Sequence, residues 1–234
     1  RMTDDPNEAV PVYLEVGQKR VFACTVEWPG WSRSGRDEAS ALAALLDHGP
    51  RYGRAISASG LPFSAPTDVD AFAVTERLPG GSGTDFGAPL AMPQADGRPF
   101  DAAELSRSQA ILTAIWSAFD AAVESAVGVA LRKGPRGGGR DLEGIVEHVR
   151  GADGGYLARL GRQRPKEIRG KAEAHAVVRR AMLDALAAGA RGELPAHGPR
   201  GGAIWRPRFF VRYVAWHTLD HAWEIEDRAI WNAG

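Results

Sequence analysis

Two hydrophobic periods follow one another along the chain, and each predicts a different kind of secondary structure. Between residues 11 and 25, apolar side chains occupy every second position on either side of a short polar turn. A period of two is typical of β-strands, so this segment predicts a β-hairpin. Residues 71–75 predict a further strand, whereas 32–35, which follow a Pro-Gly break, predict a loop. Between residues 35 and 71, apolar residues spaced by three and four positions predict a helix that ends near residue 56.

From residue 101 onward, the apolar positions follow the 3.6-residue period of an α-helix. Asp101 is a good N-cap, and Glu104 three residues later predicts a capping box. A third helix begins at Pro165 or Lys166, and Pro207 is suited to the first turn of the last helix. The predicted helices cover 101–131, 141–156, 165–189 and 207–229.

These patterns predict an α+β protein of two domains. Residues 1–97 are expected to form a small antiparallel sheet with one packed helix. Residues 98–234 are expected to form an up-down four-helix bundle, because four amphipathic helices are joined by short to medium loops.

Composition narrows the range of partners. The chain of 234 residues has 29 basic and 29 acidic residues, so its charge does not favour nucleic acid or an anionic membrane as partner. The longest apolar runs are too short to cross a bilayer. The single cysteine, Cys24, excludes a disulfide framework and favours the cytoplasm. We therefore expect a cytoplasmic protein that acts on a small molecule. The sequence leaves open whether the protein forms a homodimer.

Three histidines are the most informative polar residues. His217 and His221 are four residues apart and therefore share one face of the last predicted helix. His148 lies in a separate helix, and if the two helices pack together the three imidazoles converge. Three histidines leave one coordination position free, as catalytic metal sites do. The alternative is that they are hydrogen-bonded core residues. Because Thr218 stands where HExxH peptidases have glutamate, a zincin-type peptidase is excluded.

Two carboxylates lie close to this pair in the sequence. Asp220 is adjacent to His221, and Glu224 lies one turn beyond it. Either residue could accept a hydrogen bond from a ligating imidazole or carry a proton in catalysis. The alternative is ordinary surface pairing, since Arg228 follows Glu224 at i+4.

The start of the last helix carries Arg206, Arg208 and Arg212. Guanidinium groups near a helix N-terminus suit a carboxylate or phosphate, so these arginines are candidates for binding an anionic cosubstrate. The alternative is that they are solvated or paired with acidic residues of a neighbouring element. Trp216 and Trp223, seven residues apart, predict a stripe buried against the bundle or the N-terminal domain.

The segments Glu147-His148-Val149 and 216–221, which begins Trp216-His217, resemble the DinB-like superfamily. These four-helix proteins include mycothiol-dependent maleylpyruvate isomerase and bacillithiol transferases. The resemblance covers roughly residues 100 to 230 and implies that His148, His217 and His221 bind one divalent metal ion, zinc or nickel. It also implies a low-molecular-weight thiol such as mycothiol as cosubstrate.

The N-terminal part resembles the HicB-like fold of certain antitoxins. The similarity rests on residues 22–31, which end in Trp28-Pro-Gly-Trp31, and on the alanine-rich helix that follows. The chain departs from antitoxins in having the predicted bundle in place of a DNA-binding tail. An antitoxin role is therefore not expected.

These observations lead to three functional hypotheses. The preferred one is a metal-dependent enzyme of DinB-like type, a thiol-dependent transferase or isomerase, with lyase or hydrolase chemistry left open. The alternative is a non-enzymatic two-domain binding or regulatory protein whose HicB-like part meets a protein partner. The third is a stress-response protein in which the metal is structural or vestigial.

Overall fold

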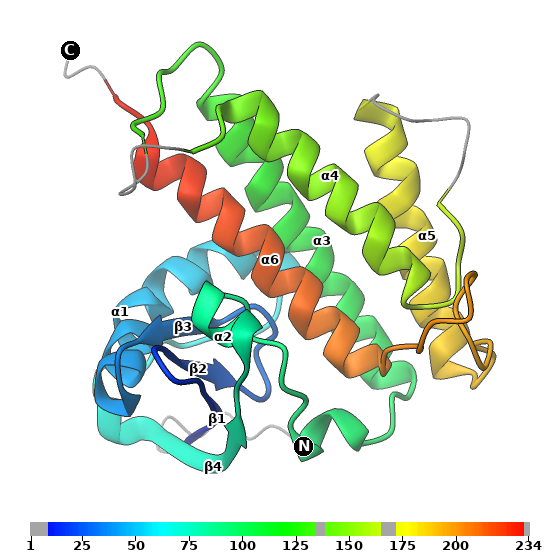
Figure 1. Cartoon of the computed structure of the whole chain (residues 1–234), viewed down its shortest axis with the longest axis horizontal. Coiled ribbons are helices and arrows are strands. Elements are labelled where there is room, and N and C mark those ends of the chain that lie inside the picture. The colour runs from blue at the N-terminus through cyan, green and yellow to red at the C-terminus, as the bar shows by residue number, and fades with distance from the viewer. Residues whose placement is uncertain (1–8, 134–138, 165–171, 232–234) are drawn as a thin grey trace.

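The computed structural model describes residues 9–133, 139–164 and 172–231, and its arrangement is α+β (Figure 1). A four-stranded sheet lies near the N-terminus, and most of the remaining described chain is helical. The strands are β1 Val10–Val16, β2 Val21–Thr25, β3 Ser32–Gly35 and β4 Phe72–Pro79. The helices are α1 Glu38–Ile56, α2 Ser82–Phe86, α3 Ala102–Ser125, α4 Leu142–Ala158, α5 Ala172–Ala190 and α6 Pro207–Arg228.

The predicted hairpin is confirmed, since β1 and β2 pair in antiparallel register with Tyr13 opposite Cys24. Two details of the prediction are wrong. Residues 32–35 form β3, which pairs with β2, and not a loop. The sheet, in the order β3-β2-β1-β4, is mixed and not antiparallel, because β4 runs parallel to β1.

The parallel strand follows from the connection through α1. β3 is parallel to β1, and α1 carries the chain from β3 across one face of the sheet to β4. A helical crossover of this kind returns the chain in its starting direction. Asp37 caps α1 in a capping box with Ser40, and the buried stripe of the helix includes Leu45 and Tyr52.

The two faces of the sheet contact different helices. Val12, Leu14 and Ala23 belong to one core cluster with residues of α1. The opposite face carries Tyr13 and Phe22, which contact α6. Alternation along the strands therefore places the sheet between α1 and α6.

The helices begin close to where the caps predict. Asp101 accepts a hydrogen bond from the backbone N–H of Glu104 at 2.9 Å. The reciprocal bond of a capping box is absent among the described contacts, because the Glu104 carboxylate pairs with Arg208 at 2.9 Å. Pro207 occupies the first turn of α6, as predicted. The predicted start of the third helix, at residue 165 or 166, lies outside the described residues.

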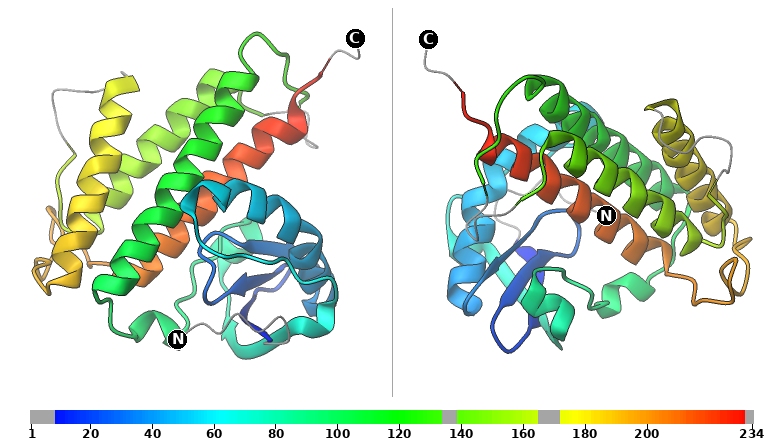
Figure 2. Two further views of the ribbon diagram at one scale, coloured as in Figure 1. Left: turned by 180° about the vertical axis from the view of Figure 1, so that it is seen from behind. Right: turned by 45° about the horizontal axis from the view of Figure 1, so that its top comes forward.

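α3 ends six residues before the end of its predicted apolar stripe. Gly128 has a φ of +76°, a left-handed conformation that stops the helix, and Leu131 instead forms an isolated bridge with Ala229. α3 packs against α5 and α6, and α4 packs against α5 and α6 (Figure 2).

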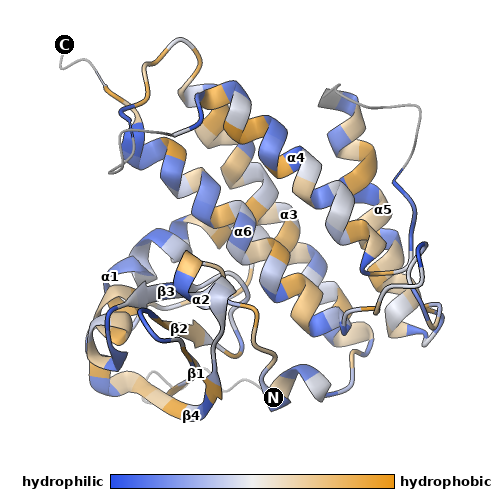
Figure 3. Ribbon diagram, in the orientation of Figure 1, coloured by the Kyte–Doolittle hydropathy of each residue, from blue (hydrophilic) through white to orange (hydrophobic). Residues whose placement is uncertain are grey.

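One hydrophobic core runs through both halves of the chain. The same cluster contains Trp31 and Tyr52 from the N-terminal part and Leu112 and Val214 from α3 and α6. Apolar and polar residues alternate around each helix (Figure 3). Among the described residues, no helix combines the length and apolarity that a membrane crossing needs.

The N-terminal part holds α6 at several points. Gly30, with a φ of +93°, lets the turn after β2 approach so closely that a Cβ there would lie 3.1 Å from the Cβ of Ala215. Phe22 meets Trp216 edge-on at 6.3 Å, and the ring of Trp223 lies 5.5 Å from that of His48 on α1. The predicted tryptophan stripe therefore packs against the N-terminal part of the protein.

Candidate metal centre

The packing of α4 on α6 brings three histidine rings together. His217 and His221 project from α6 one turn apart, and His148 projects from α4 toward them. The ring centroids are 5.2 Å apart for His148 and His217, 4.8 Å for His148 and His221, and 4.7 Å for His217 and His221. The structure thus brings the rings of the three predicted ligands next to one another.

The nitrogen positions suit a single ion. One ring nitrogen from each histidine lies within 4.8 Å of those of the other two. Nε2 of His148 and Nε2 of His217 are 3.3 Å apart. Two nitrogens bound tetrahedrally to zinc at 2.0–2.1 Å are separated by about 3.3 Å. The spacing of this pair therefore fits two imidazoles on one tetrahedral ion.

Glu224 fixes the orientation of the third ring. Nδ1 of His221 is 2.8 Å from Oε2 of Glu224, and a carboxylate at this distance favours the tautomer in which Nδ1–H donates. Nε2 of His221 is then left as an acceptor, which is the form a metal ligand needs. The hydrogen bond from His221 lowers the pKa of Glu224, and the guanidinium of Arg228 binds the second oxygen of the same carboxylate. Glu224 therefore makes both contacts that its sequence neighbours allow, one to His221 and one to Arg228.

Asp220 does not share this role. Its Oδ1 lies 3.4 Å from Nη1 of Arg33, and its side chain is about half-exposed. Of the two predicted carboxylates, Glu224 is the one that contacts a triad histidine in the described structure.

The environment of the triad keeps two of its rings neutral. His217 is 7% exposed, and burial, followed by the nearby His221 and His148, lowers its pKa to about 3. Burial, followed by His221 and Arg140, also lowers the pKa of His148. A neutral imidazole is the form that binds metal, so few protons compete for these nitrogens at neutral pH.

Aromatic residues surround His217. The ring of Tyr156 on α4 meets His217 edge-on at 5.4 Å, and the rings of Tyr213 and Trp205 lie 5.3 and 5.8 Å from Tyr156. Nδ1 of His217 is buried without a hydrogen-bond partner in the described part of the chain, so packing orients this ring. Sequence spacing did not identify this wall, because its members come from different elements.

The predicted anion site is not assembled. Arg212 is 5% exposed, donates to the backbone oxygen of Thr25 at 2.6 Å and pairs with Asp96 at 2.6 Å. Arg208 pairs with Glu104 and donates to a backbone oxygen. Arg206 is exposed at the N-cap of α6. The alternative of pairing with acidic neighbours is therefore correct for Arg208 and Arg212.

Two further residues, one histidine and the single cysteine, are buried in the described structure. His175 is a buried core histidine whose Nε2 lies 2.7 Å from Oδ2 of Asp153. Cys24 is fully buried in β2, and burial raises the pKa of its thiol to about 11. A thiol in this state is a poor nucleophile, so Cys24 is not a candidate for chemistry.

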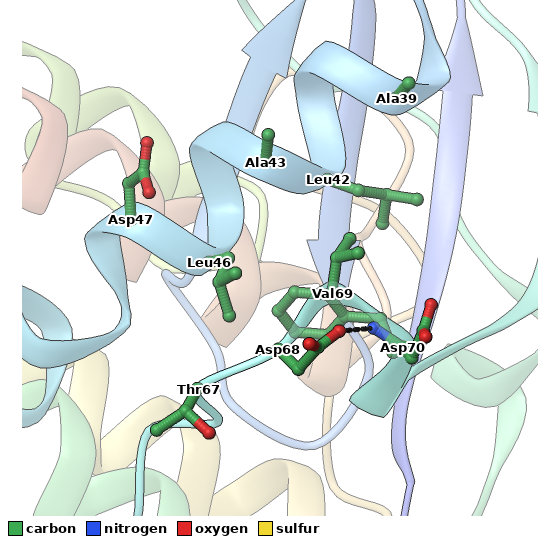
Figure 4. A pocket seen from close by; sticks show the side chains of 10 residues that line it. Ala39, Leu42, Ala43, Leu46, Asp47, Thr67, Asp68, Val69 and Asp70 are labelled. Carbon is green, nitrogen blue, oxygen red and sulfur yellow. Dashed lines mark hydrogen bonds between the residues drawn. The ribbon is translucent and has the colours of Figure 1, made fainter.

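A groove of about 660 Å³ lies away from the histidines, between α1 and the segment before β4 (Figure 4). Its apolar floor includes Leu42 and Leu46, and Asp68 stands at its rim. The Asp68 carboxylate accepts a hydrogen bond from the backbone N–H of Asp70 at 2.8 Å and so stabilises its own turn. We assign no chemistry to this groove.

Comparison with known proteins does not add to this picture: no family model, no curated protein and no solved structure matches the chain. The case for function therefore rests on the geometry of the site. Three imidazoles and one hydrogen-bonded carboxylate resemble the residues of catalytic zinc sites, which keep a coordination position for water or substrate.

Proposed function

We propose that His148, His217 and His221 bind one divalent metal ion, zinc or nickel, and that the protein is a metal-dependent enzyme. The observation that carries this proposal is the placement of three ring nitrogens within 4.8 Å of one another. Glu224 supports it, because a metal-bound histidine commonly donates its other N–H to a carboxylate.

We further propose that α3, α4, α5 and α6 form an up-down four-helix bundle of DinB-like type, preceded by the HicB-like part over residues 1–97. The pairwise packing of α3 with α5 and α6, and of α4 with α5 and α6, supports this arrangement. The resemblance at Glu147-His148-Val149 and at 216–221 supports the family, and the thiol cosubstrate rests on that resemblance alone.

In this proposal the reaction is a transfer or isomerisation of a small molecule, assisted by mycothiol or another low-molecular-weight thiol. A bound divalent ion would supply a Lewis acid that holds such a thiol as its reactive thiolate. The chain contributes Glu224, which holds the proton on Nδ1 of His221, and the aromatic side chains around His217, which limit access of water.

Metal analysis tests the first step. Protein purified without a polyhistidine tag should contain about one zinc or nickel ion per chain, in line with a single three-histidine site. The His217→Ala/His221→Ala variant should lose it. His48→Ala is the matched control, because His48 bonds the backbone oxygen of Ala44 and lies outside the triad. Metal-free protein that ignores added zinc and nickel would contradict the proposal and leave the non-enzymatic alternative.

Thiol binding tests the second step. Mycothiol or bacillithiol should raise the melting temperature of the metal-loaded protein, and the S-methylated thiols should not, because a thioether cannot become a thiolate ligand. The triad variant should show no shift with either thiol. Metal-loaded protein that does not respond to any free thiol would retain the metal site and refute the thiol cosubstrate.

A further inference from the structure

A smaller cavity, of about 230 Å³, lies between α4 and α5. Arg150 and Gly151 line it from α4, and His175 and Val178 line it from α5. These two helices pack against each other (Figure 2). None of the three triad histidines lines it.

This cavity is separate from the candidate metal centre. An α-helix turns by about 100° per residue, so Arg150 projects about 200° around α4 from His148. Asp153, which holds His175, projects about 140° around from the same residue. Gly151, which also lines the cavity, projects only about 60° around α4 from His148, so the cavity reaches the side of α4 that carries this histidine. The triad histidines themselves do not line it.

A buried hydrogen bond orients the histidine of this cavity. Nε2 of His175 is 2.7 Å from Oδ2 of Asp153, whose side chain is fully buried. An aspartate at this distance fixes the proton on Nε2 and leaves the lone pair of a neutral ring on Nδ1. Oδ1 of Asp153 has no hydrogen-bond partner among the described residues, so the pair is not saturated. His175 therefore has an acceptor nitrogen for a molecule in the cavity.

Two arginines provide positive charge at the same place. Arg150 lines the cavity, and its Nε is buried without a hydrogen-bond partner in the described ranges. Arg164, from the segment after α4, lines it as well and lies over Gly154. A Cβ at position 154 would lie 2.7 Å from Cδ of Arg164, so the arginine side chain packs closely over this glycine.

We propose that this cavity binds a small 2-hydroxycarboxylate. The guanidinium groups of Arg150 and Arg164 suit the carboxylate, since planar forks of this kind match its two oxygens. Nδ1 of His175 accepts the hydrogen bond of the hydroxyl group. A volume of about 230 Å³ is below that of sites for drug-sized ligands, which begin near 300 Å³, and leaves room for a small acid.

Calorimetry with lactate and propionate tests this assignment, because the two acids differ in the hydroxyl group. Lactate should bind the full-length protein at millimolar concentration, and propionate should bind about tenfold more weakly for want of one hydrogen bond. Chloride at equal ionic strength controls for a general salt effect. No binding of lactate, or equal binding of the two acids, would overturn the proposal.

Three variants separate the contributions. Arg150→Gln should weaken both acids by about 10- to 100-fold, because a charged hydrogen bond is lost. His175→Gln keeps an N–H that can donate to Asp153 and removes the acceptor on the cavity side, so it should abolish the preference for lactate. His217→Ala should leave lactate binding unchanged, because His217 does not line the cavity.

The variants also show how the proposal fails. Lactate binding that survives Arg150→Gln at full strength would overturn it, as would a lactate preference that survives His175→Gln in folded protein. If His175→Gln does not fold, Arg150→Gln and the comparison of the two acids in the wild-type protein still decide the matter. Loss of lactate binding in His217→Ala would contradict the separation of the two sites.

Discussion

Replacing Arg212 by methionine tests whether this arginine anchors α6 to the sheet or is available for a ligand. Its Nη1 donates to the backbone oxygens of Thr25 at 2.6 Å and Val26 at 3.2 Å, and its Nη2 pairs with Oδ1 of Asp96 at 2.6 Å. Asp96 is 2% exposed, so its carboxylate has little access to solvent. Methionine keeps the length of the side chain and removes the charge.

The expected loss is large because a buried charge is left without its partner. Removing one member of a buried ion pair costs about 3–5 kcal/mol of unfolding free energy. For a chain of this length each kcal/mol lowers the melting temperature by about 2–4 °C, so Arg212→Met should melt about 6–20 °C lower. The double variant Arg212→Met/Asp96→Leu should recover part of this loss, because no unpaired charge remains.

Urea denaturation followed by tryptophan fluorescence measures the effect. Arg206→Met is the matched control, because Arg206 is exposed at the N-cap of the same helix and should change stability by no more than about 0.5 kcal/mol. If Arg212→Met behaved like this control, the ion pair with Asp96 would not be formed in solution. The arginine would then be free for the anion that the sequence suggests.

Three further predictions concern the triad and its support. Glu224→Gln should weaken metal binding about 10- to 100-fold, because the hydrogen bond to His221 loses its charge. Competition with a chelator measures the metal affinity, and an unchanged affinity would argue against a role for the carboxylate. His217 has a pKa of about 3 in the folded metal-free protein and an ordinary value of 6.5, so between these values the unfolded chain binds the extra proton. Stability should therefore fall by about 1.4 kcal/mol per pH unit as the pH drops below 6.5, and urea denaturation of His217→Gln should lack this contribution; equal slopes for the two proteins would refute it. Trp223→Ala should lower the free energy of unfolding by about 3–5 kcal/mol, since this 4% exposed ring packs against His48. Urea denaturation measures the loss, and a value below about 1 kcal/mol would show that the contact is weak.

Much of the fold could be predicted from local pattern. The hairpin, α1 and the helix starts at Asp101 and Pro207 follow from period, caps and proline. β3 could not be found in this way, because Ser-Arg-Ser-Gly has no apolar alternation and is held by backbone pairing with β2. The direction of β4 depends on the crossover through α1, which is a property of the whole sheet.

In the candidate site, too, some contacts follow from local sequence spacing and others depend on the packing of the whole fold. The pair His217 and His221, and the contact of His221 with Glu224, lie within one or two helical turns and so follow from spacing. The place of His148, 69 residues away from His217, requires the packing of α4 on α6. The partner of Arg212 is 116 residues away, at Asp96, which is why an anion site was predicted where an internal ion pair lies.

The distribution of contacts around α6 explains how a small sheet contributes to a site that it does not line. Arg212, Trp216 and Trp223 fall within about 40° of one another around the helix, and they contact the N-terminal part. His217 and His221 lie about 140° and 180° around from Arg212, on the side of α4. Contacts on one side fix the rotation of α6 about its axis, and this rotation sets the direction of the imidazoles on the other. The N-terminal part therefore acts as a positioning support for the triad, because a turn of α6 by even one residue would move both rings by about 100° and separate them from His148.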